Sequence, residues 1–102
     1  MSEIVVDLPT KLDFASAVDS DFRARAAEGA TLDLRLIRLD EIISTSVQEN
    51  FSLLFQAPNE TPPVQTIYRL EHAKLGEMDV FLVPVKQDAD GLYFEAVFNQ
   101  LL

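Results

Sequence analysis

The sequence predicts a mainly β fold: a small antiparallel barrel or sandwich of five to six strands with one short N-terminal helix. Several short segments alternate between apolar and polar residues, which is the period-two pattern of strands with one solvent-facing side. Turn-forming residues separate these segments at short intervals, as in all-β domains. Because 102 residues is an ordinary length for one domain, we expect a single β-rich domain over residues 1–102.

The expected helix covers about residues 11–19. Thr10 is followed three residues later by Asp13, which fits a capping box, where a hydroxyl and an acid bind the first unpaired amides of a helix. Apolar residues then recur at the helical spacing of four: Phe14, Val18 and Phe22. These features predict a short amphipathic helix that packs one side on the sheet.

The end of this helix is not fixed by periodicity. Helix-forming residues continue as far as Gly29, which suits a helix C-terminus. Residues 22–26, however, also alternate apolar and charged side chains, as a half-buried strand does. Both interpretations stay open on the pattern alone.

Five further segments alternate or are rich in β-forming residues: 32–39, 51–55, 65–72, 78–85 and 92–99. The first changes phase at Leu36-Ile37, which predicts a β-bulge. Residues 40–50 are expected to form a polar connection, and the proline-rich residues 57–63 to form a loop within the sheet.

Two turns are predicted near the C-terminal strands. Gly76 marks the turn between the segments 65–72 and 78–85. The tetrapeptide Asp88-Ala89-Asp90-Gly91 is expected to form the next turn, with the Asp-Gly pair supplying the positive φ that many hairpins use.

Composition argues against several classes of function. The net charge of −9 without a basic stripe makes nucleic acids and membrane surfaces poor partners. The lack of cysteine removes disulfides and thiolate metal ligands. No basic, apolar leader and no apolar run of about 20 residues is present, so we expect a cytoplasmic protein.

His72 is the sole histidine and the first candidate for chemistry. Glu71 is adjacent, but consecutive strand residues point to opposite faces, so the two cannot share one site. A metal site needs three or four ligands, and no second histidine or cysteine exists. We therefore expect a structural role for His72, a hydrogen bond at a strand end that fixes the turn into Leu75-Gly76.

No other motif predicts catalysis. Asp88 and Asp90 lack the further spaced ligands of a calcium loop, and Ser44, Ser46 and Ser52 lie outside any nucleophile elbow. A chain of this size leaves little room for a substrate cleft. We predict no catalytic, cofactor-binding or metal-binding residues, no cofactor, and no enzyme activity.

Four segments occur in a fixed order: FSLLF at 51–55, Y-x-LEH-x-x-LG at 68–76, FLVPV at 81–85 and EAVFN at 95–99. In this order they resemble a family of short uncharacterised bacterial proteins, over about residues 12–99. The resemblance implies a strand at 22–26 after the helix, and it implies no particular activity. Family members resemble accessory proteins encoded beside phage-tail-collar-like proteins, which implies a role accessory to a phage-tail-like assembly.

The segment 80–85 is apolar on both faces, although a strand with one wet face should alternate. Its Pro84 indicates a sheet edge or a bulge. Leu54 extends the same pattern into another strand. We therefore predict an apolar partner surface, covered either by the N-terminal helix or by another chain; its residues are Leu54, Phe81, Val83 and Val85.

These observations favour a non-catalytic structural or adaptor domain, with a protein partner or self-association. The alternative is a small β-barrel that binds an apolar ligand in its interior. Nothing in the sequence indicates which small molecule such a barrel would bind.

Overall fold

The computed structural model describes residues 9–101 and confirms the mainly β fold with one short helix. Residues 1–8 and 102 of the expected domain lie outside the described part. The elements are α1 (Lys11–Ser16), β1 (Asp21–Arg25), β2 (Thr31–Ser44), β3 (Gln48–Ala57), β4 (Thr66–His72), β5 (Gly76–Asp88) and β6 (Gly91–Leu101).

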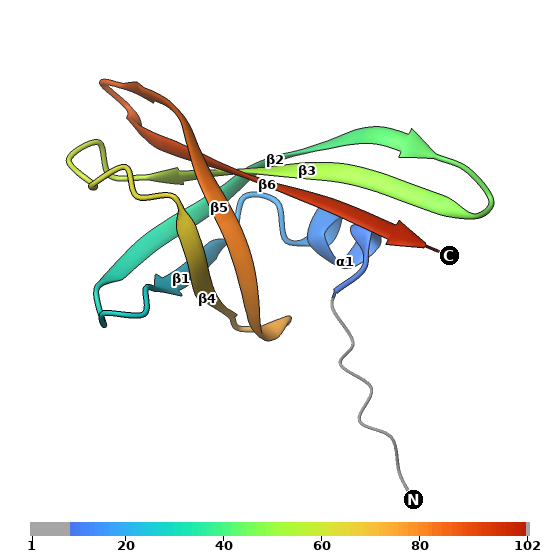
Figure 1. The fold of residues 1–102 in the computed structure, drawn as a ribbon, viewed down its shortest axis with the longest axis horizontal. Helices are drawn as coiled ribbons and strands as arrows, with labels where there is room; N and C mark the ends of the chain where they lie inside the picture. The colour runs from blue at the N-terminus through green and yellow to red at the C-terminus, as the bar shows by residue number, and fades with distance from the viewer. Residues whose placement is uncertain (1–8, 102) are drawn as a thin grey trace, which may run out of the picture.

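The six strands close into an antiparallel barrel in the order β1-β2-β3-β6-β5-β4 (Figure 1). The ring closes where the short strand β1 pairs with β4, from Arg23 opposite Glu71 to Arg25 opposite Arg69. Of the two architectures that the sequence left open, the barrel is therefore the one formed.

The helix begins as predicted and ends earlier. Thr10 and Asp13 form the capping box, with the Thr10 hydroxyl accepting from the Asp13 amide at 3.2 Å and the Asp13 carboxylate accepting from the Thr10 amide at 2.9 Å. The last helical residue is Ser16, and Asp19 then takes a positive φ of 68° that turns the chain into β1. The apolar spacing that predicted a longer helix therefore spans a helix, a turn and a strand.

The predicted polar connection at residues 40–50 is wrong. The strand β2 continues to Ser44 and β3 begins at Gln48, so that only a tight turn joins them. This hairpin extends beyond the rest of the barrel, as Figure 1 shows. Its polar residues suit a strand exposed to solvent, which explains why the apolar pattern stops before the strand does.

Register breaks occur at three places in the described sheet, and the one at Ile42 was not predicted from the sequence. Ile37 is passed over in the register between Leu36 and Arg38, as predicted, and a second irregularity follows at Ile42. The register between β5 and β6 also shifts directly after Pro84. These breaks bend the strands where the barrel curves.

The turn at residues 88–91 forms, but not for the predicted reason. The Asp88 carboxylate accepts from the amides of Asp90 at 2.8 Å and Gly91 at 3.2 Å. Of the described residues, those with positive φ are Asp19, Gly29 and Gly76, so Gly91 does not supply one. Glycine is needed there because a Cβ would lie 2.5 Å from the Ala57 carbonyl oxygen.

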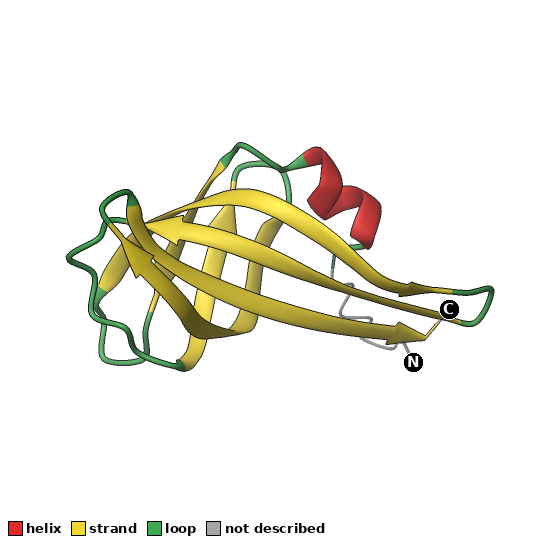
Figure 2. Ribbon diagram, turned by 90° about the horizontal axis from the view of Figure 1, so that it is seen from above, coloured by secondary structure: helices red, strands yellow, loops and turns green. Residues whose placement is uncertain are grey.

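Side chains fill the barrel interior. The largest fully buried residues are Phe14, Phe51, Phe55, Phe94, Leu34, Leu36, Leu53, Leu70, Leu82 and Leu92. The helix contributes Phe14, whose ring centroid lies 6.0 Å from that of Phe51 and 5.1 Å from that of Phe98. The short helix thus packs beside the long strands (Figure 2) and inserts one aromatic ring against their inner face.

We predict that Phe14→Ala lowers the free energy of unfolding by about 3–5 kcal/mol, because it leaves a cavity beside the buried ring of Phe51 and the partly buried ring of Phe98. Leu12→Ala on the same helix is the matched control, since Leu12 is 76% exposed, and it should change stability by less than about 0.5 kcal/mol. Denaturant unfolding measures both values. Equal effects of the two substitutions would show that the helix does not anchor through Phe14.

Candidate functional site

The four predicted partner residues lie on the outside of the barrel, in two adjoining hollows. One hollow of about 460 Å³ is lined by Phe81 and Val83, together with Val97. The other, of about 360 Å³, is lined by Leu54 and Val85, together with Ile37. We call this surface the outer apolar face; it comprises Ile37, Leu54, Phe81, Val83, Val85 and Val97.

The N-terminal helix does not cover this face, contrary to one of the two expected arrangements. Val80 and Leu82 point into the core, whereas Phe81 between them is 50% exposed. Val97 on β6 is 55% exposed. The helix packs against the inner face of the strands through Phe14. Coverage of the outer apolar face by another chain stays a prediction.

The hollow at Phe81 lies where β5 and β6 separate. From Gly76 to Leu82, β5 pairs with β4, and from Val83 to Asp88 it pairs with β6. Beyond the pair Val83–Glu95 the two strands diverge, which is visible in Figure 1. Residues 96–101 of β6 then have β3 on one side and no strand of the described chain on the other.

Glu95 occupies the junction of the two hollows and lines both. In the sheet it lies between Leu54 of β3 and Val83 of β5. Within residues 9–101 it forms no ion pair. The two bases that line a hollow with it pair with other acids: Arg38 with Asp40 at 2.7 Å and Lys86 with Asp88 at 3.3 Å. The outer apolar face therefore carries one half-buried carboxylate without a basic partner.

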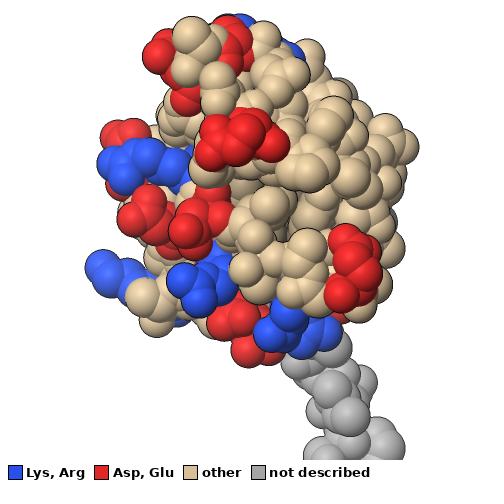
Figure 3. Space-filling model, turned by 90° about the vertical axis from the view of Figure 1, so that its left-hand side faces the viewer, with Lys and Arg blue, Asp and Glu red and all other residues tan. Residues whose placement is uncertain are grey.

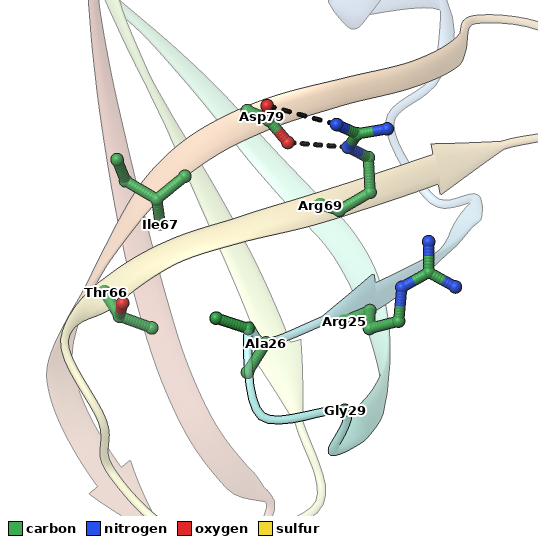
Figure 4. Close-up of a pocket in the computed structure, with 8 residues that line it drawn as sticks. Arg25, Ala26, Gly29, Thr66, Ile67, Arg69 and Asp79 are labelled. Carbon is green, nitrogen blue, oxygen red and sulfur yellow. Dashed lines mark hydrogen bonds and ion pairs between the residues drawn. The ribbon is translucent and has the colours of Figure 1, made fainter.

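A larger hollow of about 520 Å³ lies near the turn between β1 and β2 (Figure 4). Its arginines are neutralised by acids. Arg69 binds both carboxylate oxygens of Asp79, at 2.6 and 3.3 Å, and also contacts Glu77 at 3.2 Å. Arg25 lies 4.0 Å from Glu71. Within residues 9–101, both arginines that line this hollow therefore lie within ion-pair distance of an acid.

Charged side chains are unevenly spread over the face of the barrel drawn in Figure 3. Acidic and basic groups intermingle on the left and along the bottom of the view, whereas the right-hand side is mostly uncharged, with an acidic group at its lower end. Exposed ion pairs of this kind contribute little stability each, but they keep that side hydrated. In this view the uncharged side is thus the better candidate for contact with a protein.

His72 fixes the turn after β4, in the way that the sequence predicts. Its Nδ1 atom accepts from the backbone amides of Lys74 at 3.1 Å and Leu75 at 3.2 Å. Its ring also packs on Phe22, with ring centroids 4.4 Å apart. The imidazole therefore joins the end of β4 to β1.

Ser20 lies beside this histidine, with its Oγ 2.8 Å from Nε2 of His72. Because Nδ1 accepts two amide protons, the neutral ring carries its proton on Nε2 and donates it to Ser20. The Ser20 hydroxyl in turn donates to the Ala17 carbonyl. A general base would have to accept from serine instead, so this pair is arranged as a structural link and not as a nucleophile and its base.

The described residues hold no group of three or more histidine, aspartate or glutamate side chains placed to bind a metal. Among them, no helix has the length and apolar character needed to cross a bilayer.

A family model described as a domain of unknown function, DUF6916, matches residues 9–98. The chain belongs to this family. The DUF6916 match extends from the helix cap into β6 and contains every residue of the outer apolar face. Neither a curated protein nor a solved structure was matched by this DUF6916 chain.

Sequence reasoning missed Val97, Glu95 and Ser20. Glu95 and Val97 alternate with buried residues, as solvent-facing positions of any strand do. The one available signal for a partner surface was that Val97, at a solvent-facing position, is apolar. Ser20 lies 52 positions from His72 in this DUF6916 domain, and no local pattern brings the two together.

We predict that His72 makes the DUF6916 domain less stable as the pH falls below about 6.5. Burial, and secondarily the charge of Lys74, lowers the pKa of His72 in the folded state. The unfolded chain therefore takes up a proton at a higher pH than the folded chain does. Between the two pKa values the free energy of unfolding falls as the pH falls.

The measurement is denaturant unfolding of the wild type and of His72→Gln across this pH range. The variant should lose about 0.5–1.5 kcal/mol for each hydrogen bond it fails to replace at neutral pH, and its stability should fall less steeply on acidification. Parallel pH curves for the two proteins would show that His72 does not contribute to the slope.

Proposed function

We propose that this domain is a non-catalytic adaptor that binds another protein through its outer apolar face. The observation that carries the proposal is the exposure of Phe81, Val85 and Val97 on adjacent strands of a barrel whose interior is already filled. Large apolar side chains exposed close together, as here around Glu95, mark sites of protein interaction on soluble domains. The two hollows give a partner's side chains places to insert.

The filled interior argues against the alternative of an apolar ligand inside the barrel. The rings of Phe14, Phe51 and Phe98 pack together at one end, and Phe22 packs against Phe55 at 5.3 Å. A ligand-binding barrel keeps a cavity lined by such side chains. Here those side chains contact one another instead.

The resemblance to proteins encoded beside phage-tail-collar-like proteins supplies the first partner to test. A protein of a phage-tail-like assembly, encoded near the gene in its native host, is the partner that this proposal names. An adaptor in such an assembly requires a stable fold and a docking surface, and it needs no catalytic group.

We predict that Val97→Asp weakens partner binding about 30-fold or more, because it places a charge in the centre of a dry contact. Phe81→Asp should act in the same direction. Val47→Asp is the matched control, since Val47 is 64% exposed in the turn between β2 and β3, away from both hollows.

The test is affinity capture from the native host with the wild type and the three variants, followed by titration with the purified candidate partner. The wild type and Val47→Asp should retain the partner, and the other two should lose it. Equal retention by all four proteins would overturn the proposal.

A further inference from the structure

We infer that the partner docks as an extended strand beside β6, with apolar side chains in the hollow at Phe81 and a lysine or arginine that pairs with Glu95. The inference rests on the proposed adaptor function and specifies the chemistry of its partner. Three features of residues 9–101 carry it: a strand edge that pairs with no other described strand, an apolar hollow at that edge, and a carboxylate at its end without an ion-pair partner among those residues.

The first feature is the edge of β6. Its residues 91–95 pair with β5, whereas residues 96–101 have no strand of the described chain on that side. Backbone amide and carbonyl groups along such an edge can pair with an added strand, which then continues the sheet. The added strand would extend the line that β5 leaves at Val83.

The second feature is the hollow itself, which lies between the diverging strands. Val83 and Phe81 line it from β5, and Val97 and Phe98 line it from β6. An extended peptide places alternate side chains on one face, so its apolar residues would enter this hollow at every second position. The hollow thus selects for apolar side chains at alternate positions of the partner.

The third feature is Glu95, which lies at the end of the unpaired edge and lines the same hollow. A partner residue opposite Val97 would be a diagonal neighbour of Glu95, at about 7–8 Å between backbones, within reach of a long side chain. A lysine or arginine there would neutralise the carboxylate as its surroundings become dry.

Charge also argues against a second copy of this chain as the occupant. Each copy has a net charge of −9, and no basic residue lines the hollow at Phe81. The two bases of the adjoining hollow, Arg38 and Lys86, are paired with Asp40 and Asp88 of the same copy. Like charges brought together in an interface oppose association. A basic partner strand has the opposite effect and is steered toward this acidic domain.

The probe is a display library of random linear peptides, selected on the wild type, Glu95→Lys, Val97→Asp and the control Val47→Asp. The wild type and the control should select peptides with alternating apolar residues and one lysine or arginine. Glu95→Lys should select aspartate or glutamate at the same place, and Val97→Asp should select no such peptides. Nuclear magnetic resonance spectra of the variants confirm that each is folded.

The backbone pairing is tested on a selected peptide synthesised with N-methyl groups at alternate residues. Methylation of the set that faces β6 should abolish binding, and methylation of the other set should preserve it. Equal binding of both peptides would overturn the strand geometry.

Failure of the inference can be distinguished from failure of the proposed function. Peptides that depend on Val97 but carry no basic residue, and do not change in Glu95→Lys, would overturn the partner chemistry while leaving the adaptor role intact. Light scattering that shows a dimer lost in Val97→Asp and kept in Val47→Asp would identify a second copy as the occupant and overturn the basic strand. Partner capture that is indifferent to Val97→Asp would overturn the adaptor role itself.

Discussion

The change of partner along β5 determines the shape of this domain. Up to Leu82 the strand pairs with β4, and from Val83 onward it pairs with β6. One strand thereby joins the two sides of the barrel, but β6 then continues without a paired strand on that side among the described residues. The bulge after Pro84 helps β5 to bend across this junction.

The helix compensates for this divergence from within. Phe14 packs against the stacked rings of Phe51 and Phe98, and Lys11 binds Glu41 and, at 3.2 Å, Glu49. The inner face of the diverging strands is thus filled by the chain itself. Because the helix packs against the inner face, the outer apolar face is left exposed. This exposed face is the docking surface that we propose.

Local patterns in the sequence predicted most elements of this fold. The capping box at Thr10, the bulge at Ile37 and the turn at Asp88 depend on residues close together in the chain, so their signals are local. The extension of β2 and β3 through residues 40–50 was missed because its polar side chains face solvent. The separation of β5 from β6, the contact of Ser20 with His72 and the position of Glu95 depend on distant pairing, which periodicity does not encode. Four residues of the outer apolar face, Leu54, Phe81, Val83 and Val85, were named from the sequence because Phe81 interrupts an otherwise regular alternation. Ile37 and Val97 were not.

The central claim is that β6 has an open edge where β5 leaves it. Amide hydrogen exchange, resolved by residue, tests this most directly. In the absence of a partner, the amides of residues 96–101 that do not bond to β3 should exchange rapidly, whereas those in the paired region from residue 91 to 95 exchange slowly. Slow exchange at every amide of β6 in the isolated monomer would mean that the edge is already occupied, and it would contradict the account.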